Sequence, residues 1–161
     1  MNLPMNQIAA AAKPVVLIVD DNSANLLMLG DLLDGPYRVR LAKSGQQALV
    51  AAVLEPRPDL ILLDIMMPDM DGYEVIRRLR DNPLTAEIPV IYVSAKTSSE
   101  DEALGLNLGA ADYINKPINP AVMLARVGAH VSLKRLHDAL TEHNHRLEAE
   151  VTRRVNETVL V

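Results

Sequence analysis

The chain has 161 residues, which fits one compact domain plus an appendage, and its formal net charge is -5. It has no cysteine, phenylalanine or tryptophan and is 49% apolar, so disulfides and thiolate metal sites are excluded and the predicted core is aliphatic. The acidic balance, without a basic stripe, argues against nucleic acid, and no apolar run approaches the roughly 20 residues that span a bilayer.

Residues 1–14 precede the first predicted element and include a short apolar stretch at 8–12. This stretch is too short for a signal peptide core, and no basic region leads into it. We therefore expect residues 1–14 to be a disordered leader. Together with the composition, this predicts a cytoplasmic protein that contacts no membrane.

Five segments have the pattern of strands. Continuous apolar, β-branched runs at 15–19, 60–63 and 90–93 are typical of strands buried on both faces of a parallel sheet. At 37–41 apolar residues alternate with arginines, which predicts a strand with one wetter face. Residues 112–115 are a short fifth candidate.

Helical patterns lie between these strands. Leucines at helical spacing occupy 26–33, and the remaining helices are marked by start signals. These signals are the capping-box pairs Ser44/Gln47, Asp71/Glu74 and Ser99/Glu102, and the N-cap Asn119 followed by Pro120. The alternation of strand and helix, repeated five times, predicts parallel strands joined by right-handed crossovers. Five strands in this length favour a flavodoxin-like doubly wound α/β sheet, of order 2-1-3-4-5.

Polar residues follow the predicted strands where each one ends. Asp20 and Asp21 follow the first strand, Asp64 the third, Ser94 the fourth and Lys116 the fifth. In a sheet of this kind, ligands bind beyond the carboxyl ends of the strands. Each residue alone is as typical of a turn, a helix cap or a solvated side chain. Their occurrence at four strand ends in this order indicates a site.

The chemistry of this set points to phosphoryl transfer. Neighbouring carboxylates repel one another, and a divalent cation makes their cluster tolerable. Oxygen ligands without sulfur favour Mg²⁺, held by few carboxylates, waters and a phosphate. Lys116 and Ser94 can each contact a phosphoryl oxygen, and a carboxylate placed beside them can attack phosphorus and form an acyl phosphate.

Residues 15–132 resemble the receiver domain of bacterial two-component response regulators. The stretches that carry the resemblance are VLIVDDNSAN, PDLILLDIMMPDMDGYEVIRRLR, IPVIYVSA and GAADYINKPI. The resemblance implies a signalling domain phosphorylated by a sensor histidine kinase or a small phosphodonor. It implies no enzymatic activity beyond gain and loss of the domain's own phosphoryl group.

The resemblance also implies the role of each acidic residue. Asp64 is the phosphoacceptor, and it shares a Mg²⁺ ion with Asp20, Asp21 and the backbone carbonyl of Met66. The Met66 side chain stands where receivers vary, next to the phosphoryl group, and is expected to tune the rate of dephosphorylation.

The remaining implied roles belong to the last two strand ends. Ser94 and Lys116 bind the phosphoryl oxygens, and Tyr113 is the switch aromatic, which turns inward when Ser94 moves toward the phosphate. The bond between Lys116 and Pro117 is expected to be cis. Lys96, like Met66, is expected to tune dephosphorylation.

The last helix has no proline after Pro120 and is predicted to run from Asn119 to about residue 158, roughly 55 to 60 Å at 1.5 Å per residue. Beyond residue 132 its apolar residues follow three- and four-residue steps, with a stutter near the end. They are Leu133, Leu136, Leu140, Leu147, Val151 and Val155, with His143 in one core slot. We expect 133–161 to be a helical linker that forms a parallel two-stranded coiled coil; the alternative is a charged linker helix.

The homodimer is expected to use this coiled coil and also the receiver face formed by the helix at 99–108, the strand at 112–115 and the start of the last helix. The segments INPAVMLARVGAHVSLKRL and LEAEVTRRVNE resemble the linker of regulators with HD-GYP phosphodiesterase domains. Similar linkers precede diguanylate cyclase modules. The expected function is control of an output domain outside these residues, through dimer state or geometry.

Other functions fit less well. A receiver that acts alone on a protein partner remains an alternative. An aspartyl phosphatase of the haloacid dehalogenase type typically has Asp-x-Asp after its first strand, whereas this chain has adjacent Asp20 and Asp21. A flavin-binding module needs a phosphate loop after that strand, which is missing. A non-phosphorylated adaptor is expected only without Asp64 or Lys116.

Overall fold

The computed structural model describes residues 13–95 and 98–159. Strands and helices alternate through the described residues, as predicted. The elements are β1 (Val15–Val19), α2 (Ser23–Leu33), β2 (Arg38–Ala42), α3 (Gly45–Val53), β3 (Leu60–Asp64), α4 (Gly72–Asp81), β4 (Val90–Ser94), α5 (Ser99–Asn107), β5 (Asp112–Asn115) and α6 (Pro120–Val159). The leader predicted at 1–14 lies almost wholly outside the described residues.

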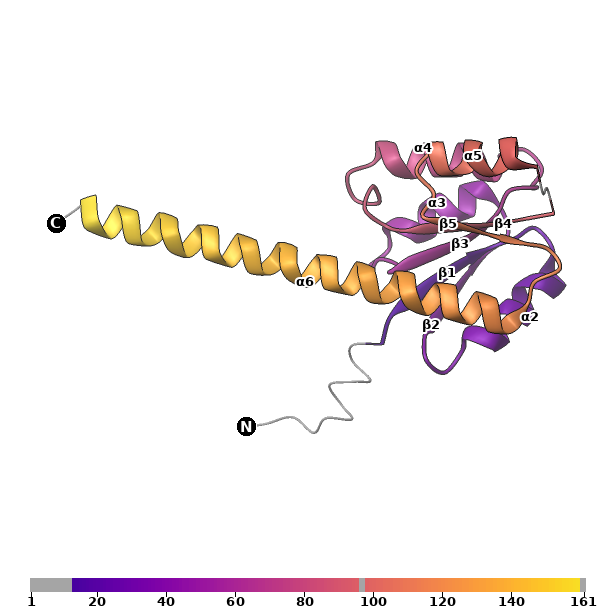
Figure 1. Ribbon diagram of the computed structural model, residues 1–161, viewed down its shortest axis with the longest axis horizontal. Coiled ribbons are helices and arrows are strands. Elements are labelled where there is room, and N and C mark those ends of the chain that lie inside the picture. The colour runs from indigo at the N-terminus through magenta and orange to yellow at the C-terminus, as the bar shows by residue number, and fades with distance from the viewer. Residues whose placement is uncertain (1–12, 96–97, 160–161) are drawn as a thin grey trace.

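The five strands form one parallel sheet of order β2-β1-β3-β4-β5, which confirms the doubly wound prediction. Helices α2 and α6 cover one face, and α3, α4 and α5 cover the other (Figure 1). Because the strands are parallel, all of their carboxyl ends lie at one edge of the sheet. This edge therefore collects the residues that follow β1, β3, β4 and β5.

Two hydrophobic cores hold the sheet in place, one on each face; they are aliphatic as predicted, except that one also buries the aromatic ring of Tyr92. Successive side chains of a strand point to opposite faces, so Leu17 enters one core and Ile18 the other, both with 0% exposure. Full burial of such a side chain stabilises the fold by about 1.5 to 3 kcal/mol. The polar strand ends are thus carried on a rigid, water-excluding base.

The edge strand β2 differs from its prediction. Leu41, on the expected apolar side, is 45% exposed, and Arg40 is half-buried. The Arg40 guanidinium donates hydrogen bonds to the carbonyl oxygens of Ala51 at 2.7 Å and Pro56 at 2.9 Å. An edge strand has a neighbouring strand along one edge only. The two faces of β2 therefore differ less in burial than the alternating sequence predicts.

The predicted helix starts are confirmed at α3 and α4, where Ser44 and Asp71 each accept a hydrogen bond from the amide three residues on. The predicted start of α5 is wrong by one residue. Ser98, not Ser99, has the extended backbone of a cap, and its hydroxyl oxygen accepts a hydrogen bond from the Asp101 amide at 3.2 Å. Two successive serines offer two equivalent registers, which the pattern alone cannot separate.

Helix α6 begins at the predicted cap, where Asn119 Oδ1 accepts hydrogen bonds from the next two amides of the helix. The helix has 40 residues and extends far beyond the sheet (Figure 1). Among its described side chains, Val131 is the last buried apolar one. Just beyond, the Arg135 guanidinium contacts both oxygens of Asp59, at 3.0 and 3.3 Å. This ion pair attaches the helix where it leaves the domain.

No helix in the described ranges is long and apolar enough to cross a membrane.

Candidate functional site

Three carboxylates converge at the carboxyl edge of the sheet. Asp20 follows β1 and Asp64 ends β3, each 3% exposed, whereas Asp21 is exposed. One oxygen atom from each lies within 4.8 Å of the others. The parallel topology produces this meeting, because β1 and β3 are hydrogen-bonded neighbours that end side by side. The structure thus brings the predicted acidic residues together.

Lys116 reaches the same cluster from the end of β5. Its Nζ atom lies 3.3 Å from Asp64 Oδ2 and 3.9 Å from Asp20 Oδ2. The Lys116 amide also donates a hydrogen bond to the Ser94 carbonyl oxygen at 2.9 Å. This bond fixes the start of the loop between β5 and α6. The bond from Lys116 to Pro117 is cis, as the resemblance implied.

The electrostatics of the cluster favour an added positive charge. Burial raises the pKa of Asp64, and the Asp20 charge raises it further. A hydrogen bond from the Met66 amide, 3.0 Å from Asp64 Oδ1, and the Lys116 ammonium oppose these effects without cancelling them. An ionised Asp64 is therefore costly here, and a proton or a cation relieves that cost.

The donor set fits Mg²⁺. The ligands are hard carboxylate oxygens, and the exposed Asp21 leaves room for the waters that Mg²⁺ retains. Asn25 also belongs to this environment, since its Nδ2 atom donates to Asp20 Oδ2 at 3.2 Å. No sequence pattern singled out Asn25, although it lies in the first turn of the helix that follows Asp20.

Ser94 and Tyr113 come from β4, the neighbour of β3, and from β5, the strand beyond it. Ser94 is 2% exposed and ends β4 at the same sheet edge as Asp64. Tyr113 on β5 is half-buried, and its ring stacks on Tyr92 with 5.8 Å between centroids. Lys96 lies outside the described residues.

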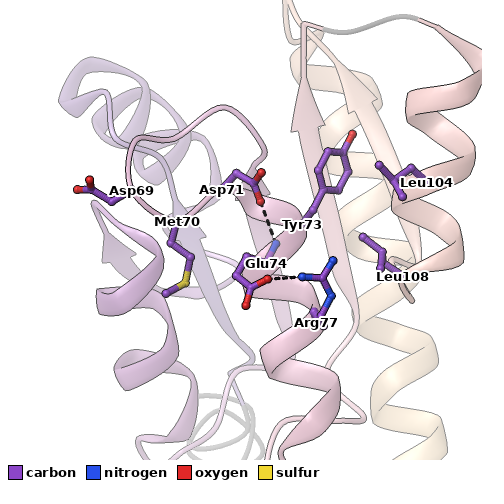
Figure 2. A pocket seen from close by; sticks show the side chains of 8 residues that line it. All are labelled: Asp69, Met70, Asp71, Tyr73, Glu74, Arg77, Leu104 and Leu108. Carbon is purple, nitrogen blue, oxygen red and sulfur yellow. Dashed lines mark hydrogen bonds and ion pairs between the residues drawn. The ribbon is translucent and has the colours of Figure 1, made fainter.

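Three cavities lie near this edge. One of about 260 Å³ is bordered by Asn25, Met28, Lys116, Pro117 and Ile118. A second of about 290 Å³ is lined by Ile65, Met66, Met67, Asp71 and Tyr73. A third of about 310 Å³ lies between α4 and α5, with Tyr73 facing Leu104 and Leu108 across it (Figure 2). None of the three contains the acidic cluster in its lining, so the candidate site is an open edge beside them.

The fold and the cluster together define a class of protein. Residues 16–128 match the response regulator receiver domain, and the chain belongs to this family. Among curated proteins it is similar to a probable cyclic di-GMP phosphodiesterase of Vibrio cholerae, 45% identical over 88% of this chain and 32% of that protein. It is also similar to response regulator PleD of Caulobacter vibrioides, 41% identical over 79% of this chain and 28% of PleD.

Solved structures of receiver proteins have the same fold. Chemotaxis protein CheY4 of Vibrio cholerae has a TM-score of 0.69 at 32% identity, over 73% of this chain and 98% of CheY4. A CheY-like receiver from Methanospirillum hungatei has a TM-score of 0.70 at 30% identity, over 78% of this chain and 99% of that one. The chain spans about a third of the length of the two curated relatives, at 32% and 28%.

Proposed function

We propose that this receiver is a phospho-accepting switch in which Asp64 takes up a phosphoryl group from a sensor histidine kinase or a small phosphodonor. The observation that carries the proposal is the Lys116 ammonium, 3.3 Å from a buried Asp64 carboxylate that already stands among two others. A lysine in a purely structural ion pair needs only one carboxylate as its partner. Here three carboxylates stand beside one lysine, and the excess negative charge is what a metal ion would neutralise.

The residues divide the chemistry among them. Asp20, Asp21, Asp64 and the Met66 carbonyl would hold Mg²⁺, which when bound neutralises charge on the phosphoryl oxygens. An Asp64 oxygen attacks phosphorus, the bond from phosphorus to the donor breaks, and the donor keeps the electron pair. Lys116 contacts one phosphoryl oxygen.

Ser94 donates a hydrogen bond to another phosphoryl oxygen. Its movement toward the phosphate lets Tyr113 turn inward, and this changes the surface formed by α5, β5 and α6. Chemistry on these residues is limited to gain and loss of their own phosphoryl group. Met66 and Lys96 adjust the rate of the loss.

Removal of metal tests this proposal. Incubation with acetyl phosphate and Mg²⁺ should raise the intact mass by one phosphoryl group. The same incubation with a chelator should reduce uptake by about 100-fold or more, because the uncompensated carboxylates repel the phosphoryl oxygens. Equal uptake with and without Mg²⁺ contradicts the proposed metal site.

We further propose that residues 15–132 form the receiver unit and that 133–161 form a linker that pairs with a second copy as a parallel coiled coil. The support for this proposal is that α6 is unbroken and has a row of exposed apolar side chains. They are Leu133, Leu136, Leu140, Leu147, Val151 and Val155, each at least 46% exposed. Because the relatives extend beyond the matched region, an output domain such as a cyclic di-GMP enzyme is a further proposal.

A charge in the row tests the coiled coil. Leu140→Glu should weaken the dimer by at least about 100-fold, because two leucines that each contribute about 1.5 to 3 kcal/mol are replaced by facing carboxylates. Light scattering with and without Mg²⁺ and beryllofluoride gives the molar mass. Thr141→Glu, exposed one position off the row, is the matched control and should dimerise as wild type. A wild-type monomer under both conditions contradicts the proposed linker.

A further inference from the structure

A buried tyrosine in the middle of β4 is bonded to the first turns of α5. Tyr92 is 2% exposed, and its hydroxyl donates a hydrogen bond to the Glu102 carbonyl oxygen at 3.0 Å, with the Asp101 carbonyl at 3.4 Å. Burial raises the pKa of Tyr92 to about 12, so the hydroxyl remains a proton donor at neutral pH. The Tyr92 side chain thus holds α5 against the sheet.

Gly105 makes this approach possible. A Cβ atom at that position would lie 2.2 Å from Cε1 of the Tyr92 ring and 2.6 Å from its hydroxyl oxygen. Glycine inside a helix costs about 1 kcal/mol relative to alanine, so helix propensity does not account for it. The helix lies on the ring because it has no side chain there. Gly105 is accordingly the one buried residue of α5.

The same ring contacts the proposed switch residue. Tyr92 and Tyr113 are paired in the parallel register of β4 and β5, and their rings stack with an interplanar angle of 26°. The Glu102 side chain also raises the pKa of the Tyr113 hydroxyl, so Glu102 acts on both tyrosines: its carbonyl accepts a hydrogen bond from Tyr92, and its carboxylate influences Tyr113. An inward turn of Tyr113 toward Ser94 would move its hydroxyl away from the Glu102 carboxylate.

We propose that Tyr92 is a positioning residue for the phosphoryl response: its hydroxyl holds α5 and Glu102, and this keeps Tyr113 in the arrangement seen here, stacked on the Tyr92 ring. This inference rests on the proposed phosphorylation of Asp64. Contacts made only in this arrangement oppose the switch, and by reciprocity they lower the affinity for the phosphoryl group that drives it. Tyr92 therefore sets how much phosphoryl ligand the switch requires.

Removal of the hydroxyl alone tests this. Tyr92→Phe keeps the ring, its stacking on Tyr113 and its fit against Gly105. With Mg²⁺ in excess, a calorimetric titration with beryllofluoride should show an apparent affinity about two- to tenfold higher than wild type, the range set by one net hydrogen bond. Its midpoint of thermal unfolding should fall, because a buried hydrogen bond is lost. Weaker folding with tighter binding is a combination that a purely structural role does not produce.

Tyr73 provides the matched control. Its ring meets Tyr92 edge-on at 6.4 Å, but its buried hydroxyl has no hydrogen-bond partner in the described part of the chain. Tyr73→Phe should leave the beryllofluoride affinity within twofold of wild type. An unchanged or lower affinity in a folded Tyr92→Phe, with normal binding by wild type, overturns this inference alone. A wild type that binds no beryllofluoride overturns the proposed function, and this inference with it.

Discussion

Replacing Asp64 with asparagine is expected to abolish phosphoryl uptake and, in the absence of metal, to make the protein more stable. Uptake is lost because asparagine has no nucleophilic carboxylate. Stability rises because burial and the Asp20 charge make an ionised Asp64 costly in the folded state. We expect a gain of about 1 to 2 kcal/mol near neutral pH, measured by denaturant unfolding in a chelator.

The pH dependence of this gain has a definite sign. The pKa of Asp64 is raised in the folded state, so the folded protein binds a proton more tightly than the unfolded chain. The destabilisation by Asp64 is full above the folded pKa and disappears as the pH falls toward the unfolded value. The stability difference between Asp64→Asn and wild type should therefore shrink on acidification. A constant difference contradicts the assigned electrostatics.

Asp71→Asn is the matched control for the loss of uptake. Asp71 lies in the loop that connects Asp64 to α4. Its side chain caps α4 by accepting a hydrogen bond from the Glu74 amide at 2.9 Å. Asparagine caps a helix about as well as aspartate. This variant should take up the phosphoryl group as wild type does. Equal uptake by Asp64→Asn, or loss of uptake in both variants, argues against Asp64 as the acceptor.

Gly72→Ala is expected to destabilise the fold strongly. Gly72 begins α4 directly beneath the end of β3, and a Cβ atom there would lie 2.7 Å from the Asp64 carbonyl oxygen and from the Ile65 Cα. Both are backbone atoms and cannot rotate away, so β3 and α4 must separate. We expect a destabilisation of about 3 kcal/mol, as for other overpacked cores, measured by urea unfolding. Phosphoryl uptake should fall as well, because Asp64 moves with the strand.

Gly30→Ala makes the same chemical change where there is space. Its added Cβ would meet only Leu41 and Val39 side-chain atoms, each at 3.8 Å, which is ordinary contact. Because Gly30 lies inside α2, alanine should stabilise the protein by about 0.5 to 1 kcal/mol. A destabilisation at Gly30 as large as that at Gly72 means that the close approach is not the cause.

The sequence was sufficient for the sheet and the acidic cluster, because both follow from local patterns. A buried parallel strand has a continuous apolar run, and a polar residue at the end of that run must lie at the carboxyl edge. Asp20, Asp64 and Lys116 were therefore located without tertiary information. The spacing of side chain and amide that makes a cap is equally local, which is why Ser44 and Asp71 were recognised.

Contacts between distant segments were not visible in the pattern. Asp59 and Arg135 are 76 positions apart, and nothing near either residue indicates the other. The packing of helix α5 is another such case. Its leucines Leu104 and Leu106 are exposed at 45% and 43%, whereas Gly105 between them is buried. The close fit of Gly105 on the Tyr92 ring, rather than hydrophobicity, decides which side of α5 packs on the sheet.

The most direct measurement is to identify the residue that carries the phosphoryl group. The protein is incubated with acetyl phosphate and Mg²⁺ and then treated with borohydride, which reduces an acyl phosphate to the alcohol. It is finally digested for tandem mass spectrometry. We predict one reduced residue, at position 64, and none when Mg²⁺ is withheld. Reduction at Asp20 or Asp21, phosphate on a histidine of α6, or no modification contradicts it.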